Sequence, residues 1–316
     1  MNRSPASYHR KRTRLLPAIT TIVVVVLLLC LGWLGLQLVT QPAQYRQSTV
    51  LVSDKVYVVS WDSERKHVVL VGLLGSVAIE GARGYGRYPL FSLLKLDTID
   101  RHGGRLFVES LSDALGLPLV GMMQISQPSE SSNSIEFLRE VFSWQSLFEV
   151  GKRRSISWGT WASWVLATAS LKADQVETIS TTHALADQVQ PDGSIVSIFD
   201  SQRFDYLYGN LFTDARIRTE GITVSVYNTT EVPTIGQRAA RILSQLGISV
   251  VTVGNDETKL SRCILTGTQE SLRSQTAEFI RSYFHCDVKK IDETQGTSDL
   301  SLQLGSDYAA IFVSRK

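Results

Sequence analysis

The sequence predicts an α/β (α+β) external region behind one N-terminal transmembrane helix, and three observations lead to this prediction. Residues 15–40 form a long apolar run. After residue 50, β-rich runs alternate with segments of helical periodicity. After residue 218 the order becomes β-α-β-β-α-β-β, which is typical of helices packed on a mixed sheet. The length of 316 residues suits about two domains.

The N-terminal segment has the charge pattern of a membrane anchor. Residues 1–14 hold five basic residues and no acid, and residues 15–45 hold no charged residue. A helix of about 20 apolar residues spans a bilayer, and a basic flank stays in the cytoplasm. A cleaved signal peptide is the alternative, but its apolar region is about 7–15 residues long and ends at a small-x-small site. We therefore expect a retained single-pass anchor at 15–40 in the lipid bilayer of the cell membrane. The tail 1–14 is then cytoplasmic and the remaining chain extracytoplasmic.

A polar spacer at 41–49 precedes a middle region, 50–217, that reads as an α/β domain. Two Val-rich runs predict a hairpin, and apolar residues at helical spacing before Gly116 predict a helix that this glycine caps. The expected elements are strands at 50–62 and 67–74, a helix at 105–115, a strand at 118–126, a loop at 127–134, helical structure over 135–173, and a strand and short helix after the turn at 191–193. Trp residues cluster in the helical stretch, and packing is their expected use.

The C-terminal region, 218–316, has the clearest pattern, and we expect a joint between two external domains near residues 214–221. Its expected elements are a strand at 222–228, a helix at 235–247, strands at 248–255 and 261–267, a helix at 271–284, and strands at 286–291 and 299–308. Two amphipathic helices and their strands suffice to close a core, so this region is expected to fold independently.

Catalytic motifs are scarce. The five histidines lack metal-ligand spacing, and neither a Gly-x-Ser-x-Gly elbow nor a phosphate loop of the Gly-x-x-x-x-Gly-Lys type occurs. The formal charge of +2 gives no expectation of a nucleic-acid partner. Residues 81–87, "GARGYGR", are interpreted as a flexible loop, or else as an anion site using Arg83 and Arg87. Arg153 and Arg154 in the "KRR" run are the other candidates for anion binding.

Two features of the C-terminal region leave alternatives open. The turn after residue 228 uses Asn228 and Thr230 either to hold a ligand or to bond nearby backbone groups as a structural turn. Cys263 and Cys286 form either a disulfide, if the region lies outside an oxidising membrane, or a pair of buried thiols. Cys30 lies inside the apolar run, where its thiol is expected to act as a small hydrophobic group with no reactive role.

The stretch "VSVYNTTEVPTIGQRAARILSQLGISVVTVGN", followed by "SRCILTG" and "LQLGSDY", resembles the LytR C-terminal domain of bacterial cell-envelope proteins. The resemblance covers about residues 220–310. Thr229 stands where that family usually has glycine, while Asn228 and Thr230 match its pattern. The resemblance implies a cell-wall setting and a domain that commonly follows a transmembrane helix and a LytR-CpsA-Psr domain.

Residues 50–210 are similar in outline to a LytR-CpsA-Psr domain. That resemblance implies transfer of anionic glycopolymers from a lipid pyrophosphate to peptidoglycan. However, the family's Ser-x-Pro-Arg-Asp motif is replaced by "GLLGSVAI", and its Arg-x-x-Arg-Gln cluster is absent unless Arg153 and Arg154 are a displaced remnant. Without paired guanidinium donors for the pyrophosphate, the domain is interpreted as degenerate.

Two functions follow from these resemblances. The leading hypothesis is a non-catalytic binding or scaffold protein of the cell envelope, with cell-wall glycan or another envelope protein as its partner and no cofactor. The alternative is a glycopolymer phosphotransferase with a rearranged site that uses Arg83, Arg87, Arg153 and Arg154, and that would need Mg²⁺. A regulator acting through its cytoplasmic tail would have only residues 1–14 to work with.

Overall fold

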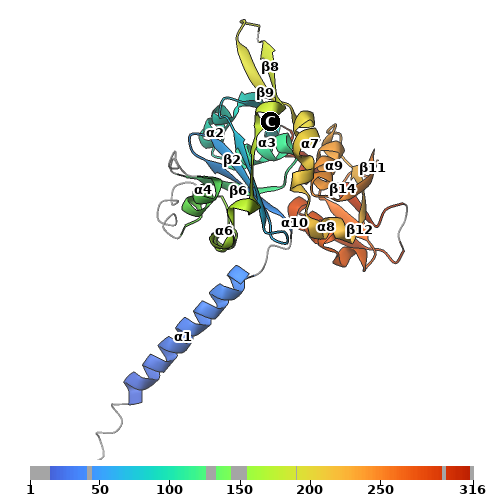
Figure 1. The fold of residues 1–316 in the computed structure, drawn as a ribbon. Helices are drawn as coiled ribbons and strands as arrows, with labels where there is room; N and C mark the ends of the chain where they lie inside the picture. The colour runs from blue at the N-terminus through green and yellow to red at the C-terminus, as the bar shows by residue number, and fades with distance from the viewer. Residues whose placement is uncertain are drawn as a thin grey trace, which may run out of the picture. The chain divides into compact units, whose positions relative to one another are not determined.

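The computed structural model describes residues 15–40, 45–125, 133–143, 155–189, 191–293 and 297–313. It contains two compact units, Met1–Pro42 and Ala43–Lys316, which are described separately. In the first unit, helix α1 spans Leu15–Thr40 (Figure 1). Among the residues that the structure describes, no helix combines the length and apolar character that crossing a membrane requires. The membrane anchor is therefore not supported by the structure and stays a prediction.

The second unit begins with a five-stranded mixed sheet in the order β6-β1-β2-β3-β7. Its strands are β1 (Gln47–Val52), β2 (Val56–Asp62), β3 (His67–Leu73), β6 (Leu119–Gln124) and β7 (Val176–Ser180). β1, β2 and β3 are joined antiparallel, whereas β6 and β7 run parallel to their neighbours at the two edges. The predicted hairpin is thus too simple, because the turn at 53–55 divides the first Val-rich run into two strands.

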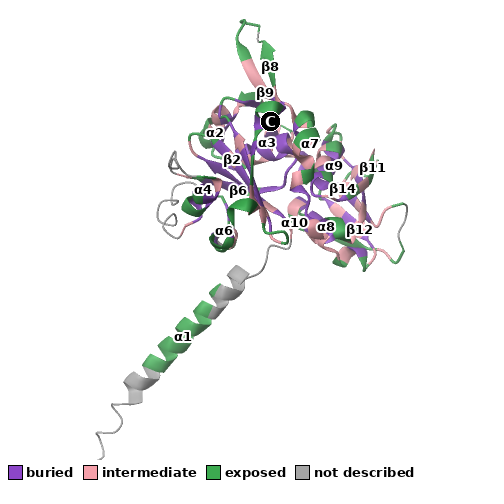
Figure 2. Ribbon diagram, viewed as in Figure 1, coloured by how far each residue is buried: buried purple, intermediate pink, exposed green. Residues whose placement is uncertain are grey.

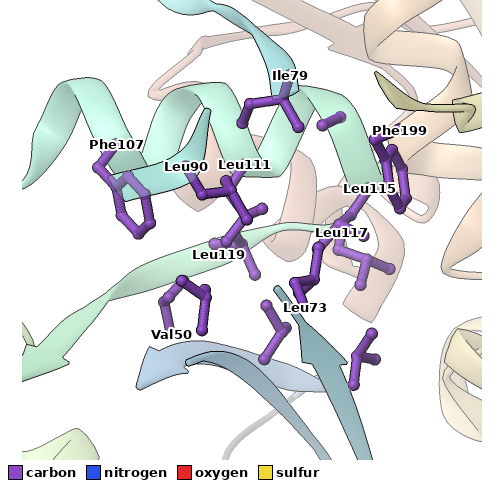
Figure 3. Packing of buried hydrophobic residues seen from close by; sticks show 14 of the residues in the cluster. Val50, Leu73, Ile79, Leu90, Phe107, Leu111, Leu115, Leu117, Leu119 and Phe199 are labelled. Carbon is purple, nitrogen blue, oxygen red and sulfur yellow. The ribbon is translucent and has the colours of Figure 1, made fainter. Parts of the chain in front are cut away.

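Helices cover both faces of this sheet, which explains why its central strands are apolar on both sides. On one face, α2 (Leu90–Ile99) and α3 (Arg105–Leu115) pack on alternate residues such as Val50 and Leu73. Figure 3 shows Phe107, Leu111 and Leu115 of α3 directed toward these strands.

On the other face lie α4 (Ser134–Val141) and α6 (Trp158–Ser170). Their aromatic side chains meet those of β2: Phe137 lies against Tyr57, and Trp164 lies against Trp61. Trp161 and Trp164 are each 1% exposed, so packing is the use of these two tryptophans, as expected. Within the described residues, the helical stretch predicted over 135–173 contains the two separate helices α4 and α6.

A second sheet, in the order β5-β4-β9-β8, was not predicted as such. It consists of β4 (Ala78–Gly81), β5 (Gly86–Pro89), β8 (Leu185–Val189) and β9 (Ile195–Phe199). The β8–β9 hairpin projects from the surrounding elements (Figure 1), and β8 is mostly exposed whereas β9 is mostly half-buried (Figure 2). Helices α7 (Ser201–Tyr208) and α8 (Ala215–Glu220) then lead to the C-terminal region.

The C-terminal region has the predicted order of elements. It contains β10 (Thr223–Asn228), α9 (Ile235–Gln245), β11 (Ser249–Asn255), β12 (Ile264–Gly267), α10 (Gln275–Phe284), β13 (Asp287–Lys290) and β14 (Leu300–Leu304), and the short helix α11 (Ser306–Ala309) follows. The strands form a mixed sheet in the order β11-β10-β14-β12-β13. Its buried side chains form a hydrophobic cluster of their own, with Ile311 packing against both this cluster and that of the middle region.

Candidate anion-binding site

Helix α3 places a group of basic side chains at its N-terminal end. The helix begins at Arg105, and the four preceding residues are Arg101, His102, Gly103 and Gly104. Both glycines have positive φ, 67° and 92°, a conformation that glycine adopts without steric strain. This double-glycine turn brings the chain around so that Arg101 and Arg105 lie at the same opening.

That opening is a cavity of about 950 Å³, which we call the cleft. Five basic residues line it: Arg83, Arg101, His102, Arg105 and His285. Among its described lining residues, Glu109 is the only acid. The cleft therefore carries net positive charge, which favours an anionic ligand.

Arg83 and Glu109 neutralise each other. The guanidinium donates from Nε and Nη2 to the two carboxylate oxygens, each at 2.7 Å. Both side chains are largely buried, and this hydrogen bonding raises the pKa of Arg83 above its ordinary value. This ion pair holds Arg83 in the wall of the cleft. The net positive charge of the cleft therefore comes from Arg101 and Arg105.

Arg101 and Arg105 supply this positive charge. Both are exposed, and neither guanidinium has an acidic partner within the part of the chain that the structure describes. Their position is unfavourable for the helix, because positive charge near a helix N-terminus adds to the helix dipole instead of offsetting it, at a cost of about 0.3–1 kcal/mol each. An anion held between them and the helix end would reverse this cost.

On the core side, a buried carboxylate supplies negative charge at the same end of the helix. Asp97, 3% exposed, accepts hydrogen bonds from the backbone N–H of Gly104 at 2.6 Å and of Phe107 at 3.4 Å. The side chain caps the helix from the core side. The basic side chains on the cleft side are left to other partners.

His102 belongs to a short polar chain at the edge of the cleft. Its Nε2 lies 3.1 Å from the hydroxyl of Tyr85, which donates to Asp100. The hydrogen bond to Asp100 raises the pKa of Tyr85. This chain fixes the imidazole ring on the rim of the cleft.

The C-terminal region forms the opposite wall. Tyr283, His285, Tyr308 and Ile311 line the cleft from this side. The hydroxyls of Tyr283 and Ser112 of α3 are hydrogen-bonded to each other at 2.9 Å. The carbonyl of Ile311 accepts a hydrogen bond from the backbone N–H of Arg83 at 2.7 Å. The cleft is thus built by both halves of the compact unit.

Of the four arginines predicted to contact an anion, the structure describes two. Arg83 lines the cleft. Arg87 lies on β5, where it contacts Glu80 at 3.7 Å and donates to Gln188 at 3.1 Å, so it is not part of the cleft lining. Arg153 and Arg154 lie outside the described residues.

Sequence reasoning overlooked Arg101, Arg105, His285 and Tyr308. A signal was present for the first two, since "RHGGR" places two arginines around a double glycine directly before an amphipathic helix. His285 and Tyr308 reach the cleft only through the tertiary arrangement.

Asn228 and Thr230 build a structural turn. The Asn228 Oδ1 accepts from the backbone N–H of Thr230 at 2.9 Å and from its hydroxyl at 2.8 Å, and its Nδ2 donates to the carbonyl of Val232 at 2.9 Å. All polar atoms of the Asn228 side chain are therefore used internally. Thr230 also lines a separate, shallower pocket of about 650 Å³ beside Lys259 and Ser306.

Cys263 and Cys286 are joined by a disulfide in the structure, with their Cα atoms 4.4 Å apart. The bridge links the residue before β12 to the residue before β13, two strands that pair in parallel. Cys286 directly follows His285 of the cleft, so the bridge braces the chain at the C-terminal wall.

Comparison with solved structures gives distant likenesses only. TagT of B. subtilis is 13% identical with a TM-score of 0.37, covering 53% of this chain and 89% of TagT. The putative transcriptional regulator ywtF of Bacillus subtilis is 11% identical with a TM-score of 0.41, covering 66% and 93%. TagV of B. subtilis is 8% identical with a TM-score of 0.39, covering 66% and 99%. At this level the likenesses assign no activity.

No curated protein matches the sequence. A family profile does match, over residues 221–308, and its description is "LytR cell envelope-related transcriptional attenuator". The match covers the C-terminal sheet and its helices, from the residue after α8 to Tyr308. Residues 221–308 of this chain are therefore a LytR C-terminal domain, the family of cell-envelope proteins that the sequence resembles.

Proposed function

We propose that this protein is a non-catalytic binding protein of the bacterial cell envelope, and that its cleft holds a phosphate-bearing wall glycopolymer. The observation that carries the proposal is the pair Arg101 and Arg105, unpaired with any described acid, at the N-terminal end of α3. Guanidinium groups and helix N-termini are both suited to phosphate oxygens. The LytR C-terminal domain supports the envelope setting.

The alternative, a phosphotransferase, finds less support at the end of β3. The residues that follow this strand are Leu74, Gly75 and Ser76, where the resembling transferases carry Arg and Asp. A Cβ at Gly75 would lie 2.1 Å from the ring of Phe91. No arginine or aspartate fits at Gly75 unless Phe91 moves.

The cleft also offers no free carboxylate, among its described lining residues, for the Mg²⁺ that a transferase would use. Glu109 is committed to Arg83. We therefore assign binding to the cleft and derive no transfer step.

A binding assay with matched variants tests the proposal. The full chain in mild detergent is titrated with purified wall teichoic acid, a phosphate-rich wall polymer, and with hyaluronate and dextran as carboxylate and neutral controls. We expect teichoic acid to bind and its affinity to fall as salt screens the charges.

The Arg101→Ala/Arg105→Ala double variant should weaken this binding at least tenfold. Arg87→Ala, an exposed arginine outside the cleft, is the control and should leave binding unchanged. Equal loss in both variants, or equal affinity for all three polymers, would contradict a phosphate site in the cleft.

We further propose that residues 15–40 anchor the protein with its compact unit outside the cytoplasm. This rests on the uncharged apolar sequence and the basic residues before it. Protease added to intact spheroplasts should digest the C-terminal domain. Complete protection of that domain would contradict the proposed location.

A further inference from the structure

The C-terminal wall of the cleft contains a hydroxyl group that has no partner among the residues the structure describes. Tyr308 lies in α11, is 7% exposed, and lines the cleft. Its ring packs between Phe284 and Phe312, at centroid distances of 5.1 and 5.5 Å. Within the described residues its hydroxyl makes no hydrogen bond, although the hydroxyl oxygen is not fully closed off from solvent. The hydroxyl is therefore open to a hydrogen-bond partner in the cleft.

The hydroxyl of Tyr308 is suited to donate. Burial raises the pKa of this phenol well above its ordinary value, so it remains protonated at neutral pH. The neighbouring phenol of Tyr283 is already engaged with Ser112. Of the two tyrosines on this wall, Tyr308 is therefore the one with a donor to offer.

The wall that carries Tyr308 is held against α3 by charged contacts. Arg241 of α9 donates to both carboxylate oxygens of Asp205, at 2.5 and 2.7 Å, and to the carbonyl of Ala114 near the end of α3 at 3.0 Å. Arg238 pairs with Asp113 of the same helix. These contacts join the C-terminal domain to the C-terminal end of α3, and the cleft extends along this helix from Arg105 to Ser112.

We infer that Tyr308 is a ligand-binding residue, whose hydroxyl donates a hydrogen bond to the anionic group that Arg101 and Arg105 attract. The C-terminal domain then completes the binding site and is not a separate appendage. This inference rests on the proposed function of the cleft. It assigns to the LytR C-terminal domain of this chain a direct role in recognising phosphate.

The test removes only the hydroxyl. Tyr308→Phe should weaken teichoic acid binding about tenfold, the effect expected from losing one hydrogen bond to a charged group, while the thermal midpoint stays within a degree or two of wild type. Tyr227→Phe is the control, because Tyr227 is a partly exposed residue of β10 outside the cleft lining. Arg105→Ala is measured in parallel.

The outcomes separate the two proposals. If wild type binds, Arg105→Ala loses binding and Tyr308→Phe equals wild type, the role of Tyr308 is wrong and the cleft stands. If wild type binds none of the phosphate polymer, both proposals are wrong.

Hydrogen–deuterium exchange of the wild type provides a check that needs no variant to fold. Ligand should slow exchange in residues 101–109 and also in residues 305–311. Slowing confined to the first segment would overturn the role of Tyr308.

Discussion

At the scale of single residues, the protein places its charges in two contrasting ways. Arg46 is 2% exposed and donates to Ser60 at 2.7 Å, and its Nη1 lies 3.9 Å from Asp62. Burial lowers its pKa to about 10, although the nearby Asp62 and Asp214 oppose this shift. Arg101 and Arg105, by contrast, are exposed and have no acidic partner among the described residues. Arg46 therefore stabilises the fold, whereas Arg101 and Arg105 are available to a ligand in the cleft.

The disulfide gives the first prediction at this scale. Cys263 and Cys286 are 23 residues apart, and a chain-entropy model gives about 3 kcal/mol for a loop of this size. Replacing both by Ser should lower the free energy of unfolding by about this amount in urea titrations, while Cys30→Ser should have no effect. Thiol labelling of Cys263 and Cys286, in addition to Cys30, in protein purified without reductant would show that the bridge does not form.

Tyr283 gives the second prediction. Burial raises its pKa from 10.0 to about 12, although the hydrogen bond to Ser112 opposes the shift. The folded protein keeps the phenol proton where the unfolded chain releases it. The resulting stabilisation is complete below pH 10 and is lost as the pH rises toward 12. At 1.36 kcal/mol per pKa unit, it amounts to at most about 3 kcal/mol.

The measurement compares urea unfolding of wild type and Tyr283→Phe at several pH values from 9 to 12, a range set by the pKa shift above. The variant should lose less stability than wild type over this interval. An identical loss in both proteins would mean that Tyr283 is not the group responsible.

At the scale of elements, helix α3 connects the cleft to the contact between the two halves. Its N-terminal end carries Arg105, and its C-terminal end is held by Arg241 and by Gly116 in the left-handed conformation. The apolar face between them is buried against β6 and β4. Because α3 is held at both ends, it keeps the two walls of the cleft at fixed positions relative to each other.

Arg241→Ala tests this contact. The variant removes hydrogen bonds to Asp205 and to the carbonyls of Asp113 and Ala114, so we expect a loss of about 2–3 kcal/mol in unfolding free energy. Arg262→Ala is the matched control, because its pair with Asp287 is exposed and lies within the C-terminal domain. Such a pair is worth at most about 1 kcal/mol. Equal effects of the two substitutions would contradict the role of Arg241.

The sequence predicted the elements whose signals are local. The C-terminal order of strands and helices and the glycine cap at Gly116 both depend on neighbouring residues. Short strands such as β4 and β5 were missed, because four residues carry too little periodicity to identify. They form only when distant β9 pairs with β4.

The candidate site was predicted only in part for a related reason. Arg83 was predicted because it stands in a glycine-rich loop, and the same loop led to the prediction of Arg87, which lies outside the cleft lining. Tyr308 lies more than two hundred residues from Arg83 along the chain, and nothing local to either marks them as neighbours. A site shared by two halves of a chain depends on tertiary packing that no local pattern encodes.

At the scale of the whole molecule, the chain combines two hydrophobic clusters with one shared cleft. The cluster of the C-terminal domain includes side chains from α9, α10 and α11 and from three of its strands, such as Val226, Leu243, Phe279 and Leu302. Among the described residues, Ile217 of α8 is the one buried member of this cluster from before residue 218, so we expect the domain to close most of its core by itself. The boundary at residues 217–218 remains a prediction, as do the outer limits of the middle domain.

An isolated fragment of residues 218–316 tests that boundary. It should unfold in a single cooperative transition, because all described buried members of its cluster except Ile217 lie within these residues. Its thermal midpoint should be lower than that of the same region in the full chain, since Arg238 and Arg241 lose their partners. A fragment with no cooperative transition would contradict an independent domain.

The central claim is that the cleft at the start of α3 binds phosphate between the two halves of the protein. The most direct measurement is a crystal structure of the protein grown with millimolar pyrophosphate, a small mimic of the polymer's phosphates in the concentration range of weak anion sites. We predict difference density in the cleft, in contact with Arg101, Arg105 and the hydroxyl of Tyr308. Density elsewhere on the molecule, with the cleft empty, would contradict the account.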